Sequence, residues 1–462
     1  MRIPFARKAR IVAAALATAL SLTSLTACGG SSGSGDSKSL EMWTFKQSHV
    51  SALRAAAKEF KKETGISVSI EAYTPDDAYT TKIQSAAKTG DLPDLLEVNS
   101  DGGDRVLGAA GILADISADF KGDWADRIQP AVQDSGFVTE LRYKNSLNKE
   151  SKEHGIKKGA RYSVPLTVGT FGIVYANKKM LADAGITKAP ANWQEFLDAL
   201  KATKAKDPKN GGLSLGLKVP ATGLTWLLQP MAFAQLGQQD YEKLWSKDET
   251  KDFGSPNGVK VLSMYDQVTP YWMPGSQTLT IDQADQAFAQ GKSAFDVGGT
   301  FTLAYLKQNG MNPDDVLAFG MPAPEDGAVP DLALGPLALT GVSITTSSKQ
   351  PDNAKKWMEF LSQQDVATQF AKDATDLPAT ELGADSAKVL GPTLSALVDS
   401  FKGTPESTYD PSRGDEFRPV GYEQDDVGAV LADLSPLKQQ SVEETARKIR
   451  ELNQSYWKAA GQ

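Results

Sequence analysis

The chain has very little cysteine and histidine. Its 462 residues include one Cys and two His. A single Cys excludes an intramolecular disulfide and a zinc or iron–sulfur site built from cysteines, and two His exclude a multi-His metal centre. Acidic residues outnumber basic ones, 57 to 49, which argues against a nucleic-acid-binding protein because such proteins neutralise phosphates with Lys and Arg. We therefore expect no metal, no cofactor and no nucleic-acid partner.

The only long hydrophobic run lies near the N-terminus, in residues 11–27, behind four basic residues and no acidic one. This order predicts a secretory signal, residues 1–27. The signal ends in Leu25-Thr26-Ala27-Cys28, which resembles the bacterial lipobox, so we expect Cys28 to be acylated. A transmembrane anchor is disfavoured because 17 residues are fewer than the ~20 needed to span a bilayer.

After Cys28 the chain lacks apolar residues as far as position 39 and is rich in Gly and Ser. We interpret residues 28–38 as the acylated Cys and a flexible tether. The remainder is long enough for two or three packed units of ~100–200 residues, and its 40% hydrophobic and 23% charged residues are typical of a soluble body. The expected location is the extracytoplasmic face of the bacterial cell membrane, with membrane contact through the lipid.

Strand and helix patterns alternate along the body, which predicts an α/β fold with largely parallel sheets covered by helices. In such sheets, ligands bind beyond the carboxyl ends of the strands. The expected strands are residues 40–45, 66–73, 92–98, 162–177, 213–219, 293–297, 316–322 and 338–345. The expected helices are residues 50–63, 79–88, 179–184, 193–205, 226–236, 281–290, 352–370 and 441–460.

Two segments stand apart from this alternation. Residues 140–161 contain seven Lys or Arg against three Glu, without apolar periodicity. A solvated surface loop is the favoured interpretation over a docking patch, because charge runs usually stay in water. Residues 162–177 are β-prone but interrupted by Pro165, Gly169 and Gly172. A strand interrupted in this way can leave one packed unit and enter another.

Catalytic motifs are weak. Gly212-Leu213-Ser214-Leu215-Gly216 has the spacing of a nucleophile elbow, but that motif needs a later His and both His precede Ser214. Gly291-Lys292-Ser293 lacks the upstream Gly of a phosphate loop. Neither His49 nor His154 belongs to a metal signature. Paired carboxylates for glycosidic chemistry remain open, because only geometry distinguishes a working pair.

Several segments resemble, in order, the family 1 extracellular solute-binding proteins that serve carbohydrate ABC importers. These segments are Tyr79-Thr80-Thr81-Lys82, Gly90-Asp91-Leu92-Pro93-Asp94, Tyr162-Ser163-Val164-Pro165, Tyr175-Ala176-Asn177-Lys178, Ala184-Gly185-Ile186, Asn192-Trp193-Gln194-Glu195-Phe196, residues 287–294, residues 348–354 and Leu377-Pro378-Ala379-Thr380. The resemblance covers nearly the whole body behind the lipobox. It implies the two-lobe fold of periplasmic binding proteins, with about three chain crossings, a ligand in the cleft between the lobes and closure about a hinge.

The resemblance also implies where the lobes and the site lie. Lobe one is expected at residues 39–168 and 340–380, and lobe two at 169–339 and 381–462. The ligand-binding residues expected from the matching loops are Phe45, Gln47, Tyr79, Asn99, Asp101, Thr170, Trp226, Thr300, Phe301 and Tyr422. The loops also contain Lys46, Ser100, Gly299, Gly421 and Glu423. Aromatic rings would cover the C–H faces of a sugar, and polar side chains would bind its hydroxyl groups.

Structural roles compete at several of these positions. Trp226 stands among leucines, so burial in the core is as good an explanation as stacking. Tyr79 could simply pack its helix, and Asp101 with Gly102 is a common turn pair. Phe301 departs from the family, which commonly has Trp there. Trp43 and Trp193 are interpreted as structural.

The leading hypothesis is a lipid-anchored, non-catalytic receptor that delivers a sugar or oligosaccharide to the permease subunits of an ABC importer, and that works as a monomer. One alternative keeps the receptor but changes the ligand to a peptide, a polyamine or a metal chelate. The other alternative is a secreted glycoside-active enzyme.

Overall fold

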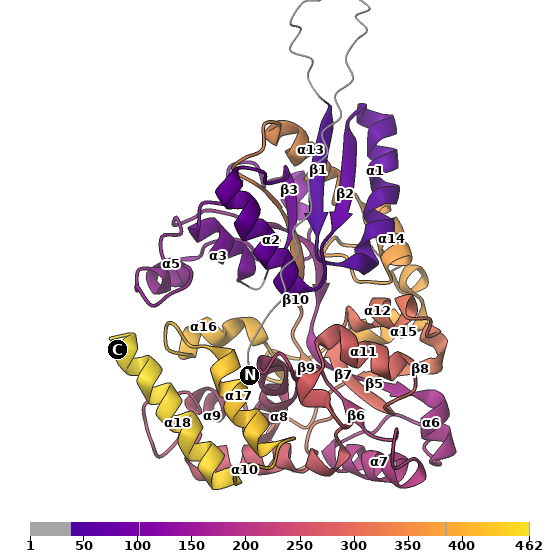
Figure 1. Cartoon of the computed structure of the whole chain (residues 1–462), viewed down its shortest axis with the longest axis vertical. Coiled ribbons are helices and arrows are strands. Elements are labelled where there is room, and N and C mark those ends of the chain that lie inside the picture. Colours follow the sequence, from indigo (N-terminus) through magenta and orange to yellow (C-terminus); the bar gives the residue numbers. More distant parts are fainter. Residues whose placement is uncertain (1–37, 101, 384–385, 462) are drawn as a thin grey trace, which may run out of the picture. The chain divides into compact units, whose positions relative to one another are not determined.

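The computed structural model describes residues 38–100, 102–383 and 386–461 (Figure 1). The expected signal, Cys28 and the tether up to residue 37 lie outside the described residues, and so does Asp101. Within the described part, no helix combines the length and the apolarity that crossing a membrane requires.

The first lobe is built around a five-stranded sheet in the order β2-β1-β3-β10-β4. Its strands are β1 (Ser39–Thr44), β2 (Ser67–Ala72), β3 (Leu95–Asn99), β4 (Val164–Gly169) and β10 (Leu337–Ile344). Strand β10 is antiparallel to both of its neighbours and runs against the other four. The helices are α1 (Val50–Thr64), α2 (Asp76–Thr89), α3 (Gly103–Ala109), α4 (Asp123–Asp126), α5 (Glu140–Ser146), α13 (Pro351–Leu361) and α14 (Gln364–Ala374).

The second lobe is built around a four-stranded sheet in the order β6-β7-β5-β8, beside a short β11-β9 pair. Here β5 runs against the others. The strands are β5 (Phe171–Asn177), β6 (Leu213–Ser214), β7 (Phe295–Gly299), β8 (Val316–Gly320), β9 (Ala333–Leu334) and β11 (Thr408–Tyr409). The helices are α6 (Lys178–Asp183), α7 (Trp193–Lys206), α8 (Gln229–Leu236), α9 (Gln238–Lys243), α10 (Pro256–Asp266), α11 (Ile281–Ala289), α12 (Thr302–Gln308), α15 (Ser386–Asp399), α16 (Gly414–Phe417), α17 (Gln424–Leu434) and α18 (Val442–Ala459).

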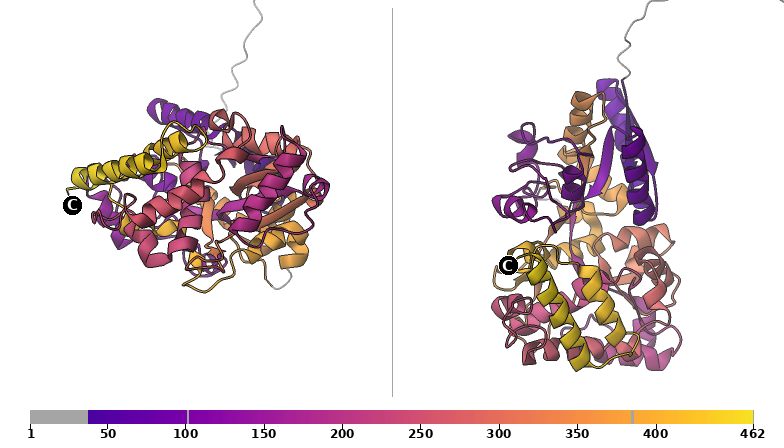
Figure 2. Two further views of the ribbon diagram at one scale, coloured as in Figure 1. Left: turned by 90° about the horizontal axis from the view of Figure 1, so that it is seen from below. Right: turned by 60° about the vertical axis from the view of Figure 1, so that its left-hand side comes forward.

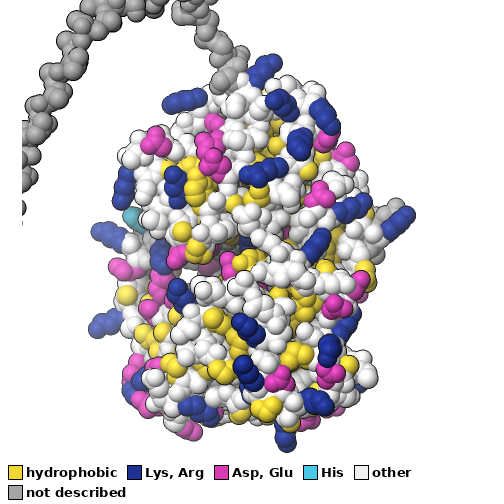
Figure 3. Space-filling view, turned by 45° about the vertical axis from the view of Figure 1, so that its right-hand side comes forward, with side chains coloured by type: hydrophobic (Ala, Val, Ile, Leu, Met, Phe, Trp, Pro, Cys, Tyr) yellow, Lys and Arg dark blue, Asp and Glu magenta, His cyan; other side chains and the backbone are white. Residues whose placement is uncertain are grey.

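The predicted α/β architecture of two lobes is therefore confirmed, with one reversed strand in the main sheet of each lobe. Figure 2 shows α17 and α18 packed side by side on the outside of the second lobe. In Figure 3, charged side chains of both signs are scattered over the face shown, and hydrophobic ones form only small groups.

Strands β4 and β5 are consecutive in the chain but belong to different sheets, so the segment predicted as a crossing does connect the lobes. A Cβ atom at Gly169 would lie 1.8 Å from Thr300 Oγ1, and only glycine allows this close approach. The chain passes between the sheets again from β9 to β10. After α14 the backbone runs along β4, where Val168 N donates to Leu377 O at 2.9 Å.

Two sequence expectations were wrong in detail. The helix expected at residues 352–370 is divided into α13 and α14 at Ser362 and Gln363, because Gln363 takes an extended conformation with ψ 140°. The break allows Phe360 and Phe370, one on each helix, both to be buried. The strand expected at residues 213–219 extends only over Leu213–Ser214, because the backbone beyond it bonds to residues 276–279 instead of β7: Leu217 N donates to Ser276 O and Lys218 N donates to Leu279 O.

Candidate functional site

Three aromatic rings of the second lobe form a compact group. The rings of Phe171 and Trp226 stack with their centroids 5.1 Å apart and their planes 6° apart. Phe301 meets these rings edge-on, at 6.3 Å from Phe171 and 6.1 Å from Trp226. Both arrangements are favourable for aromatic pairs. We call Phe171, Trp226 and Phe301 the aromatic platform, whose three rings all belong to the second lobe.

Local backbone structure places these rings. Phe171 opens β5, Phe301 immediately precedes α12, and Trp226 lies in a π-helical segment, Gly223–Leu228, that leads into α8. Single π-helical turns are rare and frequent at functional sites. A Cβ atom at Gly172, where φ is 83°, would lie 3.0 Å from the Trp226 carbonyl oxygen, so glycine lets the strand approach this segment.

The first lobe contacts the platform through Lys46, in the loop after β1. The Lys46 Nζ lies 4.0 Å from the centroid of the Phe301 ring and 5.2 Å from that of Phe45. An ammonium group over an aromatic face is attracted by the negative potential of the ring. The platform therefore lies at the border between the two lobes.

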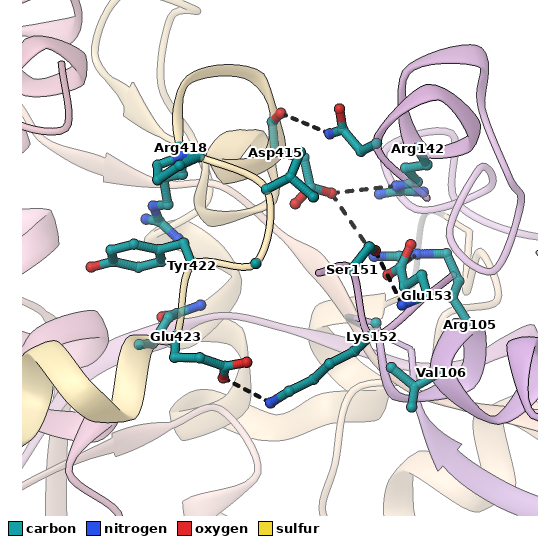
Figure 4. Close-up of a pocket in the computed structure, with 16 residues that line it drawn as sticks. Arg105, Val106, Arg142, Ser151, Lys152, Glu153, Asp415, Arg418, Tyr422 and Glu423 are labelled. Carbon is teal, nitrogen blue, oxygen red and sulfur yellow. Dashed lines mark hydrogen bonds and ion pairs between the residues drawn. The ribbon is translucent and has the colours of Figure 1, made fainter. Parts of the chain in front are cut away.

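A cavity of about 240 Å³ is lined by both lobes (Figure 4). The first lobe contributes Gly102, Arg105, Val106, Arg142, Asn145, Ser151, Lys152 and Glu153, and the second contributes Asp415 and residues 418–424. In Figure 4 the two sets of side chains face each other, with Lys152 extended toward Glu423. We call this space the interlobe cavity.

The cavity is rich in guanidinium and carboxylate groups. Arg105 Nε donates to Glu153 Oε1 at 2.7 Å, and Asp415 Oδ2 lies 3.9 Å from Arg105 Nη2 and 3.8 Å from Arg142 Nε. Burial and the neighbouring Arg105 lower the pKa of Arg142. Burial also raises the pKa of Glu153, although Arg105 opposes the shift. Buried donors and acceptors at these distances can bind hydroxyl or charged groups of a ligand.

The sequence profile of the bacterial extracellular solute-binding proteins matches residues 46–368, which include the platform and the first-lobe side of the cavity. The chain belongs to this family. Among its relatives is YcjN of Escherichia coli (strain K12), named as a periplasmic-binding protein of an ABC transporter. YcjN is 26% identical over 309 residues, which cover 66% of this chain and 64% of YcjN. The match thus spans less than two thirds of that relative's length.

Two further proteins are similar over more of their length. The diacetylchitobiose binding protein DasA of Streptomyces coelicolor is 23% identical over 389 residues, 80% of this chain and 82% of DasA. A solute-binding protein of Thermotoga lettingae, solved with α-D-tagatose, has a TM-score of 0.68 and 21% identity. That comparison covers 92% of this chain and 100% of the other. The likeness to it confirms the two-lobe fold.

The structure of this solute-binding protein brings some of the expected residues together. Trp226 and Phe301 come together in the platform, whereas Tyr422 lines the interlobe cavity, whose lining includes none of the three platform residues. The Tyr422 ring packs against Tyr456, with centroids 5.5 Å apart, and burial raises the pKa of Tyr422 to about 12. Trp226 is only 6% exposed, so it is both a packed residue and a wall of the platform.

Other expected residues are buried away from the cavity. The Tyr79 hydroxyl lies 3.1 Å from Trp43 O and 2.8 Å from Glu97 O, so it joins α2 to the sheet. Phe45 packs against Tyr79 with ring centroids 5.6 Å apart. Thr170 and Thr300 are buried at the first crossing, where Thr300 N donates to Thr170 O at 3.1 Å.

Two polar positions are more open. Gln47 is exposed and lines a separate recess of about 460 Å³ with Arg54, Lys307 and Asp373. Asn99 Nδ2 donates to Asp76 Oδ2 at 3.2 Å at the end of β3. Gln47 therefore lies outside the interlobe cavity, and Asn99 is already paired within the first lobe.

Ser214 and His49, which were considered as candidate catalytic or metal-binding residues, are buried and bonded to neighbouring side chains. Ser214 is buried, and its hydroxyl donates to Asp296 Oδ1 at 2.6 Å. His49 lies between Glu97 at 2.8 Å and Asp376 at 3.0 Å, also buried. Burial alone would lower the pKa of His49, but the two carboxylates raise it to about 9, so the imidazolium is charged. In the part of the chain that the structure describes, no His, Cys, Asp and Glu cluster is suited to hold a metal ion.

Sequence reasoning missed Phe171, Arg105, Arg142 and Asp415. Phe171 stands inside the crossing segment, where its aromatic ring beside two glycines was a usable signal. Arg105 and Arg142 are far from Asp415 in the sequence, and no local pattern connects them. The basic run at residues 140–161 was noticed, but its contact with residues 415–423 follows only from the fold.

Proposed function

We propose that this protein is the lipid-anchored binding component of an ABC importer, which captures a sugar or oligosaccharide between its lobes on the extracytoplasmic face of the cell membrane and delivers it to the permease. The observation that carries the proposal is the aromatic platform at the lobe border, together with a cavity rich in hydrogen-bonding groups. A sugar needs both, because its C–H faces stack on rings and its hydroxyl groups require polar partners. The ligands named for DasA and for the Thermotoga lettingae protein support a saccharide.

Phe301 and Trp226 are the proposed stacking residues, and Arg105, Glu153 and Tyr422 are proposed to face the hydroxyl groups. Gln47, which lines the separate recess, and Asp101 stay proposed ligand contacts on the family resemblance alone. The lobe boundaries near residues 168, 339 and 380 are the proposed hinges. We propose that the protein acts as a monomer without chemistry of its own, as a receptor that only has to close and reopen.

Calorimetry with purified protein lacking residues 1–28 tests the ligand class. The panel contains tagatose, maltose, maltotriose, raffinose and N,N′-diacetylchitobiose, and binding must raise the melting temperature because the ligand binds only the folded state. At least one saccharide should bind and lose affinity in Phe301→Ala. Absence of any thermal shift across the panel contradicts the proposal, and release of reducing sugar would instead indicate an enzyme.

The charged lining of the cavity favours a second candidate, a charged non-sugar ligand such as a peptide or a polyamine. Glu153, Asp415 and Glu423 all line the cavity, and carboxylates of this kind bind ammonium groups. A dipeptide mixture and spermidine in the same thermal-shift screen separate the candidates. Stabilisation by spermidine without stabilisation by any saccharide would favour the second candidate.

The lipid anchor has its own test in cells. Palmitate labelling should mark the wild-type chain and not Cys28→Ser. The variant should appear in the soluble extracytoplasmic fraction, because the proposed anchor is its attachment to the membrane.

A further inference from the structure

The basic segment, residues 140–161, reaches from the first lobe to the second. Asn145 Nδ2 donates to Asp415 O at 3.2 Å, and Asn148 Nδ2 donates to Ala460 O at 2.9 Å. Lys152 Nζ lies 2.7 Å from Glu423 Oε2. These contacts join three separate points of one segment to two parts of the other lobe. A merely solvated loop would not need them.

Asp415 is the shared acceptor of this region. Its carboxylate lies 3.9 Å from Arg105 and 3.8 Å from Arg142, which both belong to the first lobe (Figure 4). The two guanidinium groups repel each other, since Arg105 contributes to lowering the pKa of Arg142. A carboxylate supplied by the second lobe relieves this repulsion. Asp415 therefore favours the arrangement in which the lobes are together.

The backbone of the second lobe is shaped for the same contact. Gly421 has φ 81°, in the left-handed region, and a Cβ atom there would lie 3.1 Å from the Glu150 carbonyl oxygen. Glycine permits both the turn and the close approach. Residues of the segment and residues 415–423 line opposite sides of the interlobe cavity.

We propose that residues 142–153 and 415–423 form an electrostatic clasp, which assembles when the lobes close and slows the escape of a bound ligand. The proposal has two parts. The first part, that the contact assembles when the lobes close, does not depend on the proposed function. The second part, that the contact slows the escape of a ligand, rests on the proposed function. Two-lobe proteins close about hinges, and a contact present only in the closed form shifts the population toward that form.

Distance measurements on the ligand-free protein test the first part. The chain has a single Cys, which lies at position 28, so a body lacking residues 1–28 accepts two new labelling sites cleanly. Spin labels at Lys144→Cys in α5 and Ser455→Cys in α18 report the separation of the lobes on the clasp side. Asp415→Asn removes the charge but keeps the backbone acceptor, and it should shift the distance distribution to longer values.

Charge reversal gives the decisive comparison. Lys152→Glu and Glu423→Lys alone should each lengthen the label distance, and the double variant should return it to the wild-type value. The side chains of Lys152 and Glu423 are 67% and 35% exposed, so these reversals leave the core intact. Glu406→Gln, an exposed second-lobe residue without an ion pair among the described residues, is the matched charge control and should leave the distance unchanged.

Dissociation kinetics test the second part, with the saccharide that binds best in the panel. Asp415→Asn should raise the dissociation rate about 2- to 10-fold with a smaller change in the association rate. The clasp is overturned if the label distances in Asp415→Asn equal those in Glu406→Gln. It is also overturned if the double charge reversal does not restore the wild-type distance. If no saccharide binds but the distances respond as expected, the clasp stands and the proposed ligand class is wrong.

Discussion

A buried ionic network inside the first lobe and the ionic contacts of the clasp between the lobes are built from different chemistry. In the first lobe, His49 is fully enclosed between Glu97 and Asp376, close in the chain to the partly buried Lys46 that lies over the aromatic platform. On the clasp side the second-lobe carboxylates are partly exposed, Asp415 to 48% and Glu423 to 35%, while their first-lobe partners range from Arg105 at 5% and Arg142 at 19% to Lys152 at 67%. Buried pairs are costly to break and insensitive to salt, whereas exposed pairs are weak and screened. The His49 network is suited to permanent structure within the first lobe, and the exposed Lys152–Glu423 pair of the clasp is suited to repeated opening.

Truncating a ring of the aromatic platform should lower the stability of the protein more than any other change proposed here. Trp226→Ala removes a nearly buried indole stacked on Phe171, and we expect the free energy of unfolding to fall by about 3–5 kcal/mol. Urea denaturation followed by tryptophan fluorescence measures the change. Trp457→Ala, which removes a partly buried indole at the outside of the second lobe, should cost less. Equal losses would contradict the idea that the platform is a packed unit.

The His49 network predicts that the free energy of unfolding depends on pH. The pKa of His49 is raised from 6.5 to about 9 in the folded chain, because Glu97 and Asp376 outweigh the effect of burial. Its contribution to stability is fully present below pH 6.5 and is lost as the pH rises through 9. Between these values the wild type should lose about 3 kcal/mol of unfolding free energy.

His49→Gln is the variant that checks this profile. Without an imidazolium between two buried carboxylates it should be less stable than the wild type at pH 6, and the difference should narrow toward pH 10. Urea midpoints at several pH values give the comparison. A difference that stays constant with pH would show that the imidazole is held as a neutral group.

The difference between local signals and long-range contacts explains which features could be predicted from the sequence. Alternating strands and helices predicted the α/β layers, and the Pro and Gly interruptions of residues 162–177 predicted the crossing, because these are local signals. The two lobes were predicted by the resemblance to a family. Whether a side chain is buried, in contrast, depends on contacts with residues that are distant in the sequence. The sequence pattern around Tyr79 cannot show that its hydroxyl is consumed by two carbonyl groups of the sheet.

The clasp side was the least predictable part of the candidate site. Arg142 and Asp415 are 273 positions apart, and only the folding of two discontinuous lobes brings their charges within 3.8 Å. A charge run is usually solvated, which is why residues 140–161 were interpreted as a loop. The interpretation holds for exposed Lys144 and Lys149 and is incomplete for Asn145, Asn148 and Lys152.

Ligand affinity should respond more moderately than stability. Phe301→Ala removes the half-buried ring of the platform that also contacts Lys46, and we expect affinity for the bound saccharide to fall about tenfold, or about 1.4 kcal/mol. Phe301→Trp, which enlarges the stacking surface, should keep or raise the affinity. Calorimetry on both variants makes the test. An affinity unchanged in Phe301→Ala would remove this ring from the site.

The smallest expected effect is that of salt, which should change the ligand dissociation rate but hardly change the stability contributed by the His49 network. Raising NaCl from about 50 mM to about 500 mM screens the exposed pairs of the clasp, so the ligand dissociation rate of the wild type should rise about two- to fivefold. Asp415→Asn lacks the shared carboxylate and should respond less. The contribution of His49, measured as the stability difference from His49→Gln at pH 6, should hardly change over the same range because that network is buried. If salt weakened the His49 network as much as it sped dissociation, the distinction between a permanent network in the first lobe and an opening clasp would fail.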